Sequence, residues 1–143
     1  MRLRILHQGS RAQVVTVVGA LDDCPLLDDF NTLCGSSKQA AKAIAKLDNM
    51  WQTCADRGLD GIPSAWTHAA DPAREIFSFL AGAFRVLYFT GEGKVVVVGF
   101  CHQKKGQKAD SALVARAKIL RKEYLNAVRS RTVKFAVPGE ECG

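Results

Sequence analysis

The chain has 143 residues, of which 48% are hydrophobic and 24% are charged, and it carries a formal net charge of +6. This composition predicts one globular domain over residues 1–143 and excludes a disordered chain. No apolar run approaches the roughly 20 residues that cross a bilayer, and the start of the chain turns polar too early for a signal peptide. We therefore expect a cytoplasmic protein with no membrane contact.

The first half of the chain predicts two strands followed by two helices. Runs rich in β-branched residues, ended by glycine, predict strands at 2–6 and 13–19. Residues 22–33 fit a short helix with a proline near its first turn. Apolar residues at steps of three and four positions predict a longer helix over 36–58, with Gly58 as its left-handed stop.

The second half predicts a meander of strands and a final helix. A loop rich in glycine and proline over 59–73 precedes three apolar runs at 74–81, 83–90 and 94–101. Short glycine-bearing links between such runs are typical of hairpins, so we expect an antiparallel meander. One apolar stripe among basic residues predicts a helix over 110–131, after which the tail can add an edge strand.

Strands grouped apart from helices indicate an α+β fold in which the helices cover one face of the sheet. The other face must then be polar or bind a ligand. Five cysteines, an odd number without a CxxC pair or zinc-like spacing, indicate reduced and mostly buried thiols. We expect no metal site and no other cofactor.

The positive charge is concentrated in the second half of the chain. Residues 1–83 carry 8 Lys and Arg against 9 Asp and Glu, whereas residues 84–143 carry 12 against 5. A basic half on an otherwise neutral protein is typical of a protein that binds polyanions. A Lys-rich surface that merely keeps the protein soluble has the same pattern.

The stretch GFCHQKKGQKAD at 99–110 places His102, Lys104, Lys105 and Lys108 at the exit of a strand. Like charges this close need bulk water or an anionic partner. Because cations at the start of a helix also oppose its dipole, a purely solvated run is the less favoured interpretation.

Arg85 lies in the middle of an apolar strand, where an unpaired cation is costly. Its guanidinium can hold two phosphate oxygens at once. The alternatives are an outward-facing side chain on a half-exposed strand, or an ion pair with Glu75 or Glu92.

The segment 83–125, AFRVLYFTGEGKVVVVGFCHQKKGQKADSALVARAKILRKEYL, resembles the core of HigB/RelE-type toxins, in particular their phage-derived branch. The shared pattern is an aromatic–Arg–apolar–apolar–aromatic strand, a glycine hairpin, a valine-rich strand and Lys-Lys-x-Gln-Lys at the opening of a helix. The element order also fits over 13–82, but nothing in 1–12 or 132–143 matches. The matching residues are Phe84, Arg85 and Tyr88 in the strand, and Lys104, Lys105, Gln107 and Lys108 at the helix.

The resemblance implies a RelE-like fold, with 1–12 as an N-terminal extension and 132–143 as a C-terminal tail. Such toxins are ribosome-dependent endoribonucleases, held inactive by a small DNA-binding antitoxin encoded beside them. The resemblance therefore implies that this chain cleaves mRNA in the ribosomal decoding site without a metal. Its partners would be a cognate antitoxin of the helix-turn-helix type, the ribosome and mRNA.

RNA cleavage without a metal requires removal of the 2′-hydroxyl proton, stabilisation of the crowded phosphate and protonation of the leaving 5′-oxygen. We assign Arg85 and Lys104 to the phosphate, and His102, whose ordinary pKa suits proton transfer near neutrality, to the proton. A solvated imidazole is the alternative for His102. The residues assigned to RNA binding are Lys105, Lys108, Tyr88, His68 and Arg116, with Tyr88 or Phe89 as a stacking platform.

Three departures from the family pattern keep other functions open. Three residues separate Phe100 from the lysine pair, Gly106 and Ala109 replace hydroxyl residues, and Phe77 stands where relatives place an arginine. The last change removes a cation from the expected substrate face. A catalytically weak RNA-, ribosome- or antitoxin-binding module on the same fold, or a protein whose basic surface docks an acidic partner, is therefore an alternative.

Overall fold

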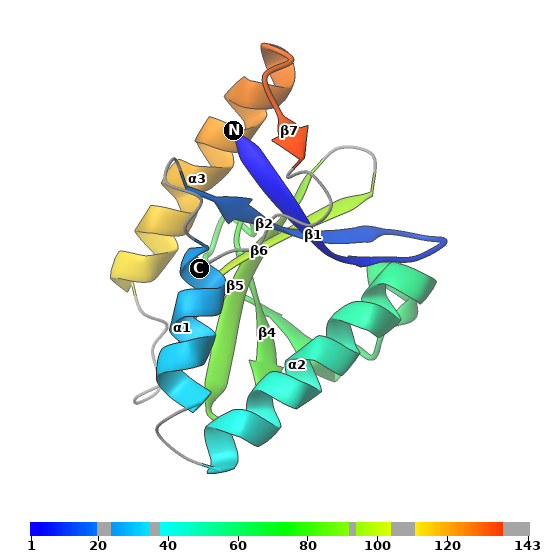
Figure 1. Cartoon of the computed structure of the whole chain (residues 1–143), viewed down its shortest axis with the longest axis vertical. Coiled ribbons are helices and arrows are strands. Elements are labelled where there is room, and N and C mark those ends of the chain that lie inside the picture. The colour runs from blue at the N-terminus through cyan, green and yellow to red at the C-terminus, as the bar shows by residue number, and fades with distance from the viewer. Residues whose placement is uncertain (20–23, 35–37, 92–93, 104–110, 136–143) are drawn as a thin grey trace.

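The computed structural model describes residues 1–19, 24–34, 38–91, 94–103 and 111–135. These residues form an α+β fold of three α-helices and one seven-stranded mixed sheet (Figure 1). None of the helices in these ranges has the length and apolar character needed to cross a membrane. The elements are β1 (Arg2–Gln8), β2 (Gln13–Val18), α1 (Pro25–Cys34), α2 (Lys38–Arg57), β3 (Thr67–Ala69), β4 (Phe77–Ala81), β5 (Phe84–Gly91), β6 (Val95–Gln103), α3 (Ser111–Arg129) and β7 (Lys134–Phe135), with short 3₁₀ turns at Leu59–Gly61 and Ser64–Trp66.

The strand order in the sheet is β3-β4-β5-β6-β2-β1-β7. Strands β3 to β6 form an antiparallel meander, which confirms the prediction for the three apolar runs and adds β3 from the segment expected to be loop. β2 lies beside β6 in parallel orientation, from Gln13 opposite Val95 to Thr16 opposite Val98. β1 lies between β2 and β7 in the sheet. Most of residues 1–12, which were predicted to be an N-terminal extension, therefore belong to the sheet.

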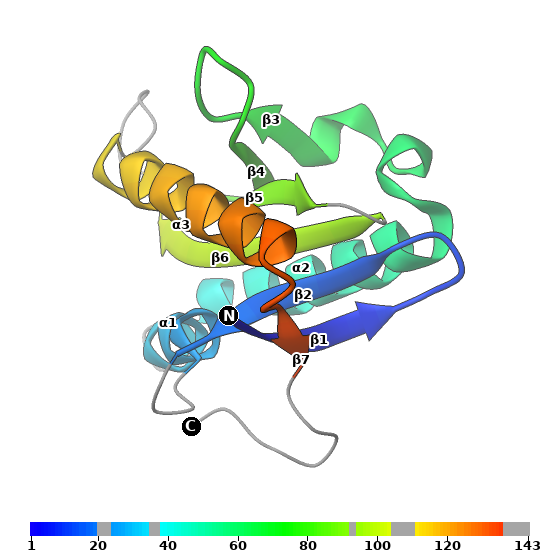
Figure 2. The ribbon, with the colours of Figure 1, turned by 90° about the horizontal axis from the view of Figure 1, so that it is seen from above.

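Helices cover both faces of the sheet, so the prediction of a single covered face is wrong. Figure 2 shows α3 on one side of the strands and α2 on the other. Along β5, Val86 belongs to the core beneath α1 and α2, whereas its neighbour Leu87 belongs to the core beneath α3. The valine-rich run of β6 has the same cause, because a strand buried on both faces is apolar throughout and does not alternate.

Both long helices bury the apolar stripes that the sequence predicts. In α2, Leu47, Trp51 and Cys54 are buried, and the helix stops at Gly58, which has φ of 81° and donates its N–H to the Cys54 carbonyl at 2.7 Å. In α3, Tyr124 packs edge-on against Phe89 of β5, with ring centroids 5.6 Å apart. These stripes fix each helix to its own face of the sheet.

The described thiols are reduced and buried, as expected. Cys24, Cys54 and Cys101 are free cysteines with no disulfide. Burial raises the pKa of Cys54 to about 11, and burial, with the nearby charge of Asp29, raises the pKa of Cys101 to about 12. Both thiols are therefore protonated and unreactive near neutral pH.

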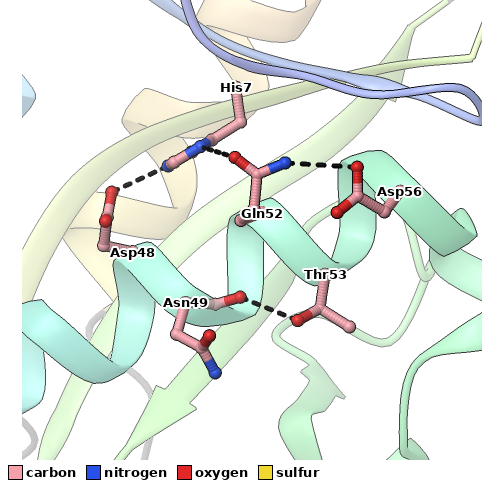
Figure 3. A network of polar contacts seen from close by, with 6 residues as sticks. All are labelled: His7, Asp48, Asn49, Gln52, Thr53 and Asp56. Atoms are coloured by element: carbon pink, nitrogen blue, oxygen red, sulfur yellow. Dashed lines mark hydrogen bonds and ion pairs between the residues drawn. The ribbon is translucent and has the colours of Figure 1, made fainter.

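The β1–β2 hairpin is attached to α2 by a polar network (Figure 3). The two ring nitrogens of His7 lie 2.7 Å from Asp48 Oδ1 and 2.8 Å from Gln52 Oε1. Next to it, a Cβ at Gly9 would overlap the backbone carbonyl of Ala55. Strand and helix approach this closely only because position 9 has no side chain.

The connection between β3 and β4 is attached to α3 by Asp71. Its Oδ1 accepts the N–H groups of Glu75 and Ile76, both at 2.9 Å, and its Oδ2 lies 3.3 Å from Lys118 Nζ. Burial alone would raise the pKa of Asp71, but the hydrogen bond from Ile76, with those from Lys118 and Glu75, outweighs it and lowers that pKa. Asp71 is thus a buried carboxylate that orders this loop.

Candidate functional site

The candidate site lies where β5 begins and β6 ends. Arg85 and His102 are direct cross-strand partners in this antiparallel ladder. Opposite residues in such a ladder point to the same face. The preceding pair, Val86 and Cys101, lies in the core beneath α1 and α2, so Arg85 and His102 face the α3 side.

Arg85 is half-buried and is held by its own hairpin. Its Nη1 donates to the carbonyls of Gly82 at 2.6 Å and Phe84 at 3.0 Å. Among the described residues Arg85 forms no ion pair with Glu75, which lies 3.9 Å from Arg121, and the alternative partner Glu92 lies outside the described residues. A guanidinium carries five N–H donors, so an oriented Arg85 keeps further donors for an anion.

A β-bulge brings His102 opposite Arg85. Leu87 pairs with Gly99 and Val86 with Cys101, which leaves Phe100 as the extra residue. If Phe100 instead paired with Val86, as in a regular ladder, every later residue of β6 would move by one position, and the side chain of His102 would face the α1–α2 core. Bulges commonly redirect a side chain in this way beside functional sites.

The bulge residue Phe100 has φ of 58°, a left-handed conformation that is unfavourable for an aromatic residue. Strain of this kind costs on the order of 1–3 kcal/mol and is concentrated at functional positions. The ring packs in the core beneath α3, and the guanidinium carbon of Arg116 lies 4.8 Å from its centroid. Arg116 therefore flanks the site by covering Phe100.

Asp29 of α1 is a neighbour of the site that sequence reasoning did not select. The described pairing of β6 with β2 ends at Val98, and the N–H of Cys101 instead donates to Asp29 Oδ2 at 3.2 Å. Burial raises the pKa of Asp29, although this hydrogen bond and the charge of Arg116 act in the opposite direction. A carboxyl group with a raised pKa is suited to proton transfer.

Tyr88 and His68 lie away from Arg85. Tyr88 is 5% exposed and packs in the α1–α2 core between Phe77 and Phe79, with ring centroids 5.5 and 4.3 Å away. Phe89, the alternative stacking platform, is also buried. Neither ring is accessible to an RNA base in this structure, so the assignment of Tyr88 or Phe89 as a stacking platform needs correction.

His68 is exposed on β3 and lines a pocket of about 370 Å³ together with Arg74, Phe77 and Tyr88. This pocket is on the α1–α2 side, the side to which Phe77 points. Phe77 therefore removes no cation from the surface that holds Arg85, contrary to expectation. Arg74 lies over the Phe77 ring, 5.8 Å from its centroid.

The basic cluster is described only in part. Lys104, Lys105 and Lys108 lie outside the described residues, although Lys104 directly follows the last residue of β6. Within the described ranges, no three His, Cys, Asp or Glu side chains are close enough together to hold a metal ion. The geometry that can be assigned is thus the Arg85–His102 pair, its bulge and the flanking Arg116 and Asp29.

Comparison with known proteins adds no relative. The sequence matches no protein-family model, and no curated protein gives a significant match.

Proposed function

We propose that this protein is the toxin of a toxin–antitoxin pair of the HigB/RelE type and that it cleaves mRNA on the ribosome without a metal ion. The resemblance of residues 83–125 to those toxins motivates the proposal. The observation that carries it is the pairing of Arg85 with His102 across β5 and β6, immediately before Lys104. A bulge with a strained residue maintains that pairing.

In the proposed reaction, the ribose 2′-oxygen attacks the adjacent phosphorus and the bond to the 5′-oxygen breaks. The products are a 2′,3′-cyclic phosphate and a 5′-hydroxyl. His102 takes the 2′-hydroxyl proton and then releases it to solvent, and the leaving 5′-oxygen takes a proton from a water molecule. Arg85 and Lys104 stabilise the additional negative charge on the phosphate in the transition state.

The proposed partners follow from the same surface. Arg85, Lys104, Lys105, Lys108 and Arg116 would bind the ribose–phosphate backbone of a message presented by the ribosome. A cognate antitoxin would silence the toxin by covering these cations with acidic side chains. In this proposal the protein acts in the cytoplasm, where translation takes place.

The test is expression without an antitoxin, followed by mapping of message 5′ ends. We expect growth arrest and new 5′-hydroxyl ends within translated messages. An Arg85→Ala, Lys104→Ala double variant should remove both effects, whereas Arg129→Ala, an exposed cation in the last turn of α3, should not. If the double variant produces the wild-type ends, the catalytic assignment is wrong.

A second candidate is an RNA- or ribosome-binding module with little catalytic activity. The observation that favours it is the engagement of cations within the fold. Arg85 donates to two carbonyls, Lys118 pairs with Asp71 and Arg121 lies near Glu75. This candidate predicts that the wild-type protein associates with ribosomes without producing new RNA ends.

A further inference from the structure

A second cationic site lies at the other end of the β5–β6 hairpin. A pocket of about 380 Å³ is formed where the β1–β2 turn, the end of α2 and the start of β6 meet. Three cations line it, one from each of these segments: Arg11, Arg57 and Lys94. Nothing in the resemblance or in the proposed cleavage reaction uses this pocket.

The three exposed cations line one pocket without a described counterion. No ion pair joins Arg11, Arg57 or Lys94 to an acidic residue within the described ranges. Among the described lining residues, Asp60 is the one carboxylate. Like charges that surround one cavity repel each other, so an anion inside it would relieve that repulsion.

Hydrogen bonds hold the backbone of each cationic segment in place. The Arg11 N–H donates to the Ala55 carbonyl at 3.0 Å, and the Gln13 N–H donates to the Lys94 carbonyl at 3.1 Å. Arg57 precedes Gly58, which closes α2 in a left-handed conformation. The pocket is therefore built on fixed elements, which lowers the entropic cost of binding.

The lining indicates the chemical class of the ligand. Ala12, Leu59 and Val96 give it an apolar wall, and its volume lies in the range of about 300–1,000 Å³ that is usual for small-molecule sites. Among the described lining residues, three cations and one carboxylate leave two positive charges, which match a phosphate monoester of charge about −2 near neutral pH. Guanidinium groups suit phosphate because they bind two of its oxygens in parallel.

We propose that this pocket binds a small phosphate monoester with a compact organic body, of the nucleoside-monophosphate class. The phosphate lies among Arg11, Arg57 and Lys94, the body packs on the wall of Leu59 and Val96, and Asp60 accepts a hydroxyl or amino hydrogen. This site is separate from the proposed cleavage site. Arg85 is five residues from Thr90 of the pocket along β5, about 17 Å in a strand, and faces the opposite side of the sheet.

The inference is tested by titrating the purified full chain with the 5′-monophosphates of adenosine, guanosine, cytidine and uridine, and with inorganic phosphate, by calorimetry. We expect saturable binding of at least one nucleotide, tighter than that of inorganic phosphate. Arg57→Gln and Lys94→Gln should each weaken it by about tenfold or more, since each removes a charged hydrogen-bond donor. Lys42→Gln, an exposed cation elsewhere on α2, should leave the dissociation constant unchanged.

Amide NMR shifts locate the bound nucleotide independently of RNA cleavage. We expect shifts at Gly58, Gly91 and Val95, with Arg85 and His102 unchanged. Shifts centred on Arg85 and His102 would overturn the inference, because the nucleotide would then occupy the proposed cleavage site.

Other results would also overturn it. These are no nucleotide binding in the millimolar range, equal affinity for inorganic phosphate, or wild-type affinity in the Arg57 and Lys94 variants. Binding of a triglutamate peptide in place of the nucleotides would instead assign the pocket to an acidic protein partner.

Discussion

Arg85 is oriented by hydrogen bonds to the carbonyls of Gly82 and Phe84, so its shape matters as well as its charge. Arg85→Lys keeps the positive charge but loses the planar, two-oxygen contact with phosphate. We expect the rate of RNA cleavage to fall by about 10²–10³-fold, as when one transition-state donor is removed. RNA affinity should change only a few-fold.

Single-turnover cleavage assays on programmed ribosomes measure this effect. Arg129→Lys, which makes the same exchange on the exposed surface of α3, is the matched control and should cleave at the wild-type rate. A wild-type rate for Arg85→Lys would show that the guanidinium does not contact the reacting phosphate.

Asp71 predicts how stability depends on pH. Its folded-state pKa lies below the ordinary value of 3.8, so ionised Asp71 stabilises the fold above that pH, and the contribution is lost as pH falls through the lowered pKa. Asp71→Asn should therefore destabilise the protein at pH 7. We expect about 1–2 kcal/mol, because Lys118 keeps 41% of its side chain exposed and solvent screens the pair.

Urea unfolding at pH 7 and at pH 3 measures the difference between wild type and Asp71→Asn. The difference should shrink at the lower pH, where wild-type Asp71 begins to lose its charge. An equal difference at both pH values would show that the hydrogen bonds from Glu75 and Ile76, and not the charge, determine the effect.

Gly9 in the β1–β2 turn and Gly99 in β6 predict opposite outcomes for the same substitution. At Gly9 a Cβ would overlap the Ala55 carbonyl, which as backbone cannot move aside, whereas at Gly99 it would meet nothing within 4 Å. Gly9→Ala should lower the free energy of unfolding by about 2–4 kcal/mol. Gly99→Ala should change it by about 0.5 kcal/mol or less. Equal costs in urea denaturation would contradict the close contact between the hairpin and α2.

At the level of whole elements, the bulge in β6 is the feature on which the proposed site most depends. Insertion of one alanine between Cys101 and His102 should leave Cys101 opposite Val86, place the new alanine opposite Arg85 and turn His102 toward the α1–α2 core. We expect such a variant to lose RNA cleavage. Phe100→Gly keeps the register and relieves the left-handed strain, although it gives up the packing of the ring.

Cleavage by the two variants, measured beside their folded fraction by circular dichroism, separates register from stability. Phe100→Gly should retain most of the cleavage rate in its folded fraction, and the insertion variant should not. Comparable cleavage by a folded insertion variant would show that His102 need not face Arg85.

The sequence predicts elements well where local patterns determine them. The order of strands and helices, the stop at Gly58 and the apolar stripes of α2 and α3 are all confirmed. The parallel pairing of β2 with β6 joins residues about 80 positions apart, for example Thr16 and Val98, and no local pattern encodes it. The second helical layer was missed because uniformly apolar strands do not show how many of their faces are covered.

The candidate site was predictable only in part for similar reasons. Arg85 and His102 were selected by residue type, but their direct pairing depends on an extra residue, Phe100, that looks like any other strand residue in the sequence. Tyr88 was selected because it is aromatic, and its burial between Phe77 and Phe79 depends on tertiary packing. Asp29 was missed because its neighbour Cys101 is 72 positions away.

At the level of the whole molecule, the concentration of charge predicts salt-dependent RNA binding. For single-stranded RNA the logarithm of the binding constant falls with the logarithm of salt concentration by about 0.7 for each neutralised phosphate. If Arg85, Lys104, Lys105 and Lys108 each contact one phosphate, the slope should be about −2 to −3. Replacing the three lysines by glutamine should make it shallower by about 2.

A control uses the other lysine-rich segment of the chain. Lys38, Lys42 and Lys46 are three exposed cations on α2, and their replacement by glutamine removes the same charge from the molecule. We expect this variant to keep the wild-type slope in filter-binding assays. Identical slopes for both triple variants would mean that RNA binding depends on the net charge of the protein and not on the three lysines that follow β6.

The coverage of the sheet by helices on both faces limits how any long ligand can approach. Within the described residues, both faces of the sheet are buried beneath helices, whereas side chains near the strand ends, such as Arg85 and His102, lie within reach of a polymer. Contact at the strand ends involves few nucleotides at a time and discriminates weakly between RNA sequences. In the proposed function, the choice of cleavage position would then depend mainly on the ribosome, which presents the message to the site.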